Sequence, residues 1–348
     1  MSKIALINDS HFGIKNDSAF FLDKCLDYYS NEFFPFLEKN NISQIIHLGD
    51  FFDRRKYINF NTLREIRTRF LEKILPHQTF RIILGNHDTY YKNTNDVNSI
   101  RELFRGYPNI HIHDDPISIV VDGLDLSLIP WINDENSSKI SSYIKTCNSN
   151  ILMGHLEIMG FEVISGVRQY SGLDEKDLNK FEMVISGHFH MKQSRGNIHY
   201  LGTQYQTNFG DIGSPKGFHI LDTETRELTF IENTDSFFNI IKYDDSFEPE
   251  KYIEQDLSKY ENTFVKVLVR TKNKPFIFDK FMDRLYSIDT QEISVIDDYA
   301  EKPENPLIDI SQDTLSLINK EIDDLQYDLN KDKLKLIVKD LYMEALSL

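Results

Sequence analysis

The chain has 348 residues, two cysteines and a formal net charge of −16 at pH 7. Its length suffices for one full hydrophobic core and a smaller appended domain. The cysteines do not form a Cys-x-x-Cys pair, which argues against a disulfide-stapled scaffold, and no apolar stretch approaches the length of a membrane helix. We therefore expect a cytoplasmic protein that does not enter a membrane.

Five short apolar runs are each followed by residues that can bind a metal ion. Runs of this length, bounded by Gly and Asp or Asn, are typical of buried strands that end in loops. In chain order they lead into Asp9-Ser10-His11, Gly49-Asp50-Phe51-Phe52-Asp53, Gly85-Asn86-His87-Asp88, Gly154-His155 and Gly187-His188-Phe189-His190. Because loops at the carboxyl ends of strands gather at one edge of an open α/β sheet, we expect these residues to form one site.

The regions between and after these runs define the predicted domains. Apolar spacing predicts helices over residues 19–38 and 62–75, so the first domain alternates strands and helices. A second sheet is predicted from β patterns at 117–121, 124–129, 198–201, 217–221 and 227–231. We place the end of this α/β domain at residue 235.

The last third of the chain has a different character. A β-α-β pattern at 264–269, 276–286 and 292–296 predicts a small α+β domain over residues 236–297. Residues 298–310 are rich in acids and proline and indicate a linker. Residues 311–348 predict a pair of amphipathic helices, which either pack back on the small domain or bind a partner. The preceding linker favours a partner.

The residue types of the five loops fit a pair of divalent metal ions. Two cations about 3.5–4 Å apart repel each other and need an anionic bridge between them. We predict Asp50 as the bridge, Asp9, His11 and His190 as the other ligands of one metal, and Asn86, His155 and His188 as those of the other. Imidazole, carboxylate and amide donors without thiolate favour manganese, with magnesium possible, over a structural zinc.

Two further residues of the loops are predicted to act in catalysis. His87 directly follows a predicted ligand, so it is not expected to bind the same metal. We expect it to act as a general acid that protonates a leaving oxygen beside the metals. Asp53 is expected to orient the imidazole of His87 and to favour its charged form.

The five motifs together resemble those of the calcineurin-like metallophosphoesterases. Members of that family carry Asp-x-His, Gly-Asp-x-x-Asp, Gly-Asn-His-Asp, Gly-His and Gly-His-x-His in this order. The resemblance covers about residues 3–231. It implies a double β-sheet sandwich flanked by helices and the ligand roles given above.

Later motifs resemble the SbcD branch of the family, the nuclease subunits of double-strand-break repair complexes. Tyr200-Leu201-Gly202-Thr203, followed by Phe209-Gly210-Asp211, is similar to that branch, although Gln204 stands where proline is usual. Residues 129–131 and 85–93 are closer still to recombination nuclease subunits of T-even-type tailed phages. A phage origin would place the protein in the host cytoplasm.

This second resemblance implies a two-metal DNA exonuclease and endonuclease that works in a complex. It implies that residues 236–297 form a DNA-capping domain and that residues 311–348 bind the coiled coil of an SMC-type, SbcC-like ATPase subunit. A homodimer is also expected. Two alternatives remain: a metal-dependent phosphatase or small-molecule phosphodiesterase, and a mainly structural subunit that anchors the ATPase.

Basic residues near the motifs are candidates for DNA contacts. Arg54, Arg55 and Lys56 follow Asp53, and Lys92 lies just beyond the Asn86 loop. The alternative is that they are solvated loop residues. Because the net charge is strongly negative, we expect modest intrinsic affinity for DNA and help from a partner.

Overall fold

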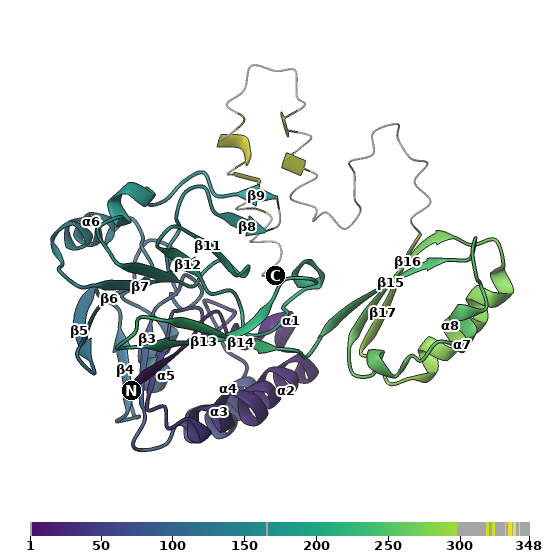
Figure 1. Cartoon of the computed structure of the whole chain (residues 1–348), viewed down its shortest axis with the longest axis horizontal. Helices are drawn as coiled ribbons and strands as arrows, with labels where there is room; N and C mark the ends of the chain where they lie inside the picture. Colours follow the sequence, from purple (N-terminus) through teal and green to yellow (C-terminus); the bar gives the residue numbers. More distant parts are fainter. Residues whose placement is uncertain are drawn as a thin grey trace. The chain divides into compact units, whose positions relative to one another are not determined.

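The computed structural model describes residues 2–164 and 166–297, together with positions 318, 319, 322, 323, 331, 333–335, 337, 338 and 341, all helical (Figure 1). The predicted linker, 298–310, lies outside the described residues, as does most of the predicted helix pair, 311–348. The chain divides into two compact units. Of the described residues, the first unit contains those up to 204, residues 214–233 and the tail positions, and the second contains 205–213 and 234–297.

The first sheet of the first unit has six strands in the order β14-β13-β1-β2-β3-β4. They are β1 (Lys3–Ile7), β2 (Gln44–His47), β3 (Thr79–Ile83), β4 (Ile110–His113), β13 (Lys216–Asp222) and β14 (Leu228–Asn233). Strands β1 to β4 are parallel, and β13 pairs antiparallel with β1. The prediction that 217–221 and 227–231 belong to the second sheet is therefore wrong, because β13 pairs with β1 of the first sheet and β14 pairs with β13.

The second sheet also has six strands, in the order β11-β12-β10-β7-β6-β5. They are β5 (Ile117–Val121), β6 (Leu124–Ile129), β7 (Ile151–Gly154), β10 (Met183–Ser186), β11 (Gln193–Arg195) and β12 (Ile198–Tyr200). Strands β6, β7, β10 and β12 are parallel, with antiparallel strands at both edges.

The two sheets pack face to face over one apolar core. Side chains of the first sheet, such as Leu6 and Ile46, lie in the same buried cluster as Leu128, Met153 and Ile185 of the second. Since alternate residues of a strand face opposite sides, the other side chains of each sheet point toward covering helices. The predicted double β-sheet sandwich flanked by helices is confirmed.

Helices cover the outer faces of both sheets. Those of the first unit are α1 (Ile14–Asp17), α2 (Ala19–Tyr28), α3 (Phe34–Lys39), α4 (Phe60–Arg69), α5 (Ser99–Phe104) and α6 (Ser137–Thr146). The predicted helix over 19–38 is interrupted by a π-helical turn at Tyr29–Phe33. Rings of Phe33 and Phe36 pack on Phe218 of β13, with Phe33 fully buried and Phe36 half-buried at the edge of the core.

The remaining short elements of the first unit are two strands and two turns of 3-10 helix. They are β8 (Glu162–Ile164), β9 (Val167–Arg168), Leu71–Lys73 and Glu175–Leu178. The predicted helix over 62–75 thus ends as α4 at Arg69 and continues only as a 3-10 turn.

The second unit is a three-stranded parallel sheet, β15-β16-β17, covered by helices. Its elements are Phe209–Asp211 and Ser258–Tyr260 (3-10 turns), β15 (Phe238–Asp244), α7 (Lys251–Glu254), β16 (Phe264–Thr271), α8 (Pro275–Ser287) and β17 (Glu292–Asp297). The predicted β-α-β pattern is present, and β15 is an additional strand. Helix α8 buries Phe278, Phe281 and Leu285, spaced three and four residues apart as one helix face requires.

No helix among the residues that the structure describes has both the length and the apolar character needed to cross a membrane.

Candidate metal centre

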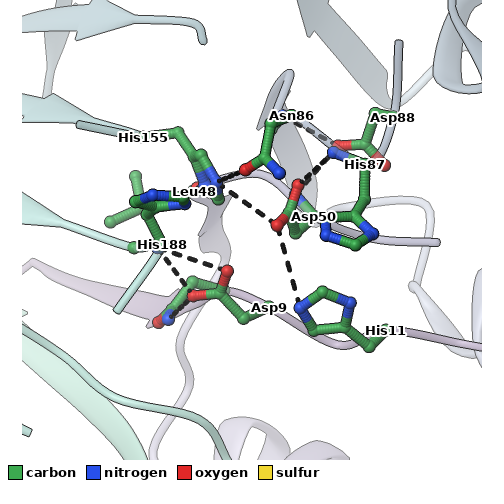
Figure 2. A network of polar contacts seen from close by, with 12 residues as sticks. Asp9, His11, Leu48, Asp50, Asn86, His87, Asp88, His155 and His188 are labelled. Carbon is green, nitrogen blue, oxygen red and sulfur yellow. Dashed lines mark hydrogen bonds and ion pairs between the residues drawn. The ribbon is translucent and has the colours of Figure 1, made fainter. Parts of the chain in front are cut away.

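The five motif loops meet at the carboxyl ends of adjacent parallel strands from both sheets (Figure 2). Backbone hydrogen bonds join the loops: the N–H of Asp9 donates to the carbonyl of Gly49 at 2.9 Å, and that of Gly187 to Gly154 at 3.1 Å. Between the sheets, the N–H of His188 donates to Asp9 Oδ2 at 2.9 Å. The structure therefore brings the residues predicted from five separate segments into one site.

One group of metal-binding side chains consists of Asp9, His11 and His190. Their ligand atoms all lie within 4.8 Å of one another. Nε2 of His11 and Nε2 of His190 are 3.1 Å apart, so the two ring nitrogens point at the same small volume. Two imidazole nitrogens at this distance need a proton or a cation between them.

A second group consists of Asp50, His155 and His188, again with ligand atoms within 4.8 Å of one another. Asn86 joins it, since its Oδ1 lies 3.0 Å from Nε2 of His155. Nδ1 of His155 is 2.8 Å from the carbonyl oxygen of Leu48, which directs Nε2 toward the site.

Asp50 connects the two groups. Its Oδ2 lies 3.4 Å from Nε2 of His155 in the second group and 3.7 Å from Nε2 of His11 in the first. Its Oδ1 accepts a hydrogen bond of 2.7 Å from the N–H of His87. One carboxylate oxygen thus faces both groups, as a bridging ligand must.

The electrostatics of the site favour the addition of positive charge. Burial opposes a charge on His11, yet its hydrogen bond with Asp53 and the nearby charges of Asp50 and Asp9 raise its pKa to about 9. Burial likewise opposes a charge on His155, but Asp50 raises its pKa to about 9. Buried imidazoles that retain protons in this way indicate an excess of negative charge. Carboxylate, imidazole and amide donors that converge in such a field fit divalent cations.

The backbone of the site is unusual at the predicted ligands. Asp9, His11, Asp50 and His188 all have positive φ, between 43° and 83°. L-residues with side chains rarely adopt this conformation, and it tends to persist where the surrounding structure holds a functional group in place. Gly85 is required for a different reason: a Cβ there would lie 2.1 Å from Asp50 Oδ1.

Asp88 is a structural residue of the site that sequence reasoning missed. Its carboxylate is fully buried and accepts four backbone hydrogen bonds, from Asp50, Phe51, Phe52 and Gly85, at 2.9 to 3.2 Å. Burial and the charge of Asp50 raise its pKa to about 7, against the effect of these donors. Asp88 is the last residue of the motif Gly85-Asn86-His87-Asp88, and this position was the sequence feature that could have indicated its role. Asp88 fixes the loop that carries Asp50.

His87 and Asp53 lie together, and the contact that orients the imidazole comes from the backbone of Asp53. Nδ1 of His87 is 2.5 Å from the main-chain carbonyl oxygen of Asp53, so the backbone rather than the carboxylate orients the ring. The Asp53 carboxylate instead lies 3.3 Å from Nδ1 of His11. Burial lowers the pKa of His87, although Asp50 and Asp53 oppose the shift. The charge of Asp53 thus opposes the loss of the proton from His87, and its role in keeping His87 charged stays a prediction.

The four basic residues predicted to contact DNA differ in their surroundings. The Arg54 side chain is 13% exposed, and its Nη1 lies 2.7 Å from Asp17 Oδ2. Its DNA contact stays a prediction. Arg55 is half-buried, Lys56 and Lys92 are exposed, and their DNA contacts also stay predictions.

Comparison with known proteins assigns the family. Residues 2–192 match the Calcineurin-like phosphoesterase family. The chain belongs to this family, and it is a hydrolase of phosphate esters. Membership implies divalent metal ions, which the two groups of donors described above fit.

The chain is also similar to particular nucleases. It is 31% identical over 347 residues to Exonuclease subunit 1 of Enterobacteria phage T4, covering 99% of each chain. It is 24% identical over 270 residues to the SbcD component of the SbcCD nuclease of Staphylococcus saprophyticus, covering 65% of this chain and 67% of that protein. The counterpart from Staphylococcus epidermidis is 31% identical over 102 residues, 27% of each chain.

Among solved structures, an archaeal phosphodiesterase aligns with 66% of this chain and 99% of its own. The TM-score is 0.34 and the sequence identity 17%, so this likeness carries no argument about function.

Proposed function

We propose that the chain is a two-metal-dependent DNA nuclease, with exonuclease and endonuclease activity, that works as a subunit of an ATPase-coupled complex for double-strand-break processing and recombination. Family membership and the similarity to an exonuclease subunit support a hydrolase that acts on phosphodiester bonds. The geometric observation that carries the two-metal part is the position of Asp50, whose Oδ2 faces both groups of donors.

The residues would divide into two metal sites around that bridge. One would use Asp9, His11 and His190, and the other Asn86, His155 and His188, with Asp50 shared. Bound manganese, or magnesium, would lower the pKa of water and stabilise charge on phosphorus. Asp88 holds the Asp50 loop, and the peptide N–H of His87 holds Asp50 Oδ1, so the bridging carboxylate has a fixed orientation.

His87 is proposed as the proton donor to the leaving oxygen. Its ring lies 4.8 Å, centroid to centroid, from that of His11, so it borders the first group of donors. Since Nδ1 is held by the Asp53 carbonyl, Nε2 is the nitrogen left to face a substrate. Asp53 would act in catalysis by orienting His87 with its backbone and His11 with its carboxylate.

The proposed roles of the domains come from the resemblance to the SbcD branch. We propose residues 1–235 as the nuclease domain, 236–297 as a DNA-capping domain, 298–310 as a linker and 311–348 as the helices that bind an SbcC-like ATPase. Ile337 and Leu341 are 47% and 61% exposed, and large apolar side chains on a helix surface support a partner there. A homodimer is proposed from the same resemblance.

The decisive experiment gives the purified chain a single-stranded DNA, a duplex DNA and a phosphomonoester, each with Mn²⁺, with Mg²⁺ and with a chelator. We expect cleavage of DNA with Mn²⁺ and none with the chelator. Hydrolysis of the monoester alone would instead identify a phosphatase. Unchanged DNA cleavage in chelator would contradict a metal-dependent reaction.

A further inference from the structure

Trp131 is the chain's single tryptophan, and it borders the second group of metal-binding side chains. It lies two residues after the end of β6. Its ring centroid is 5.2 Å from that of His188 and 6.0 Å from that of His155. Trp131 is half-buried, so part of the residue is accessible to solvent. Neither the metal groups nor the proton donor described above uses it.

The backbone of Trp131 is held from three sides. Its N–H donates to the carbonyl of Leu84 at 2.8 Å. Its own carbonyl accepts from Nδ2 of Asn136 at 2.9 Å and from Nδ2 of Asn95 at 3.1 Å. Asn133 adds a 2.9 Å hydrogen bond to Asn95, which ties the two loops together. An aromatic ring on a fixed backbone loses little conformational entropy when a ligand packs on it.

The charges nearby indicate which part of a substrate can lie here. The two loops that hold Trp131 also line a hollow of about 430 Å³, formed by Asn93, Thr94, Asp96, Asp134 and Glu135. The three carboxylates of this hollow disfavour a phosphate group within it. An uncharged aromatic base carries no such penalty, and a base stacks readily on an indole ring.

This inference rests on the proposed nuclease function. We infer that Trp131 stacks against the base of the nucleotide next to the scissile phosphate and so makes the enzyme favour nucleoside esters over other phosphodiesters. The competing explanation is that the ring only supports His188 and His155. The two differ in a measurable way, because loss of a support would slow every substrate equally.

Two small esters with the same leaving group test the difference. Thymidine 5′-(p-nitrophenyl phosphate) carries a base, and methyl p-nitrophenyl phosphate does not. For Trp131→Leu, we expect kcat/KM to fall by roughly 5- to 100-fold more for the thymidine ester than for the methyl ester, mainly through KM. Trp131→Phe, which keeps an aromatic ring, should retain most of the preference. Equal losses on both esters would overturn the stacking role.

A second measurement uses the unaltered protein. Because Trp131 is the single tryptophan, the tryptophan fluorescence of the protein reports on this residue alone. If a base stacks on it, that fluorescence should change on titration with thymidine 5′-monophosphate and not with ribose 5-phosphate. The same response to both compounds, or none, would overturn the inference. Cleavage of DNA by the unaltered protein is scored separately: if DNA is cleaved and the ester ratio is unchanged, only the stacking fails. If DNA is not cleaved, the nuclease proposal itself fails.

Discussion

Replacement of Asp88 by asparagine should loosen the Asp50 loop at a calculable cost. Oδ1 of Asp88 accepts the N–H groups of Phe51 and Phe52, and Oδ2 accepts those of Asp50 and Gly85. An amide keeps one oxygen and replaces the other by NH₂, so two buried N–H groups lose their acceptor. Each unmade hydrogen bond of this kind costs about 1–3 kcal/mol, giving about 2–6 kcal/mol for the pair. A typical domain has a free energy of unfolding of about 5–15 kcal/mol.

Equilibrium unfolding in urea, followed by circular dichroism, measures this cost directly. The matched control is Asp96→Asn, the same chemical change at an exposed carboxylate on the following loop, where we expect less than about 0.5 kcal/mol. Because the loop carries Asp50, Asp88→Asn should also weaken metal binding. A free energy of unfolding for Asp88→Asn that matches the control would refute the bracing role of this carboxylate.

Three further outcomes are expected. His87→Ala should retain bound metal while DNA cleavage falls by roughly 10²–10⁴-fold, and an ester with an acidic phenol leaving group should be slowed far less, because it needs less protonation. Burial, with the charge of Lys192, lowers the pKa of His219 from 6.5 to about 3, so the unfolded chain binds a proton that the folded chain excludes between these pH values. Stability should therefore fall as pH drops from about 6.5 toward 3. His219→Leu should flatten that fall in urea unfolding at several pH values, whereas His77→Leu, at an exposed site, should not. Deletion of residues 311–348 should abolish co-purification with a coiled-coil ATPase and leave hydrolysis of simple esters intact.

Each of these expectations has a contrary result. Equal slowing of DNA and the phenol ester would remove His87 from the proton-donor role. An unchanged pH dependence in His219→Leu would show that another group controls acid stability. Undiminished ATPase binding after deletion would favour packing of the tail on the rest of this chain.

The sequence predicted most of the site because the signal is local. Each ligand follows an apolar strand, and parallel strands deliver their carboxyl ends to one edge, so Asp9, Asp50 and His155 had to meet. The contact partners within the loops were harder to predict. Arg54 pairs with Asp17 from a distant segment, an outcome that its neighbours in the sequence do not indicate.

The errors in the predicted fold also come from contacts between segments that are distant in the sequence. The β patterns at 217–221 and 227–231 were recognised, but their partners were not. Strand β13 pairs with β1, which lies about 200 residues earlier in the sequence, and such long-range pairing leaves no local pattern. Strand β15 was missed. Its pairing partner, β16, follows it in the sequence only after helix α7, so no hairpin pattern marks the strand. The 3.3 Å contact of the Asp53 carboxylate with Nδ1 of His11 likewise depends on the conformation of the loops, which the sequence does not reveal.

Anomalous diffraction at the manganese edge, from crystals equilibrated with Mn²⁺, tests the two-metal account most directly. We predict two peaks about 3.5–4 Å apart with the carboxylate of Asp50 between them. One peak should lie against Asp9, His11 and His190, and the other against Asn86, His155 and His188. A single peak, or two peaks of which only one contacts Asp50, would contradict the account.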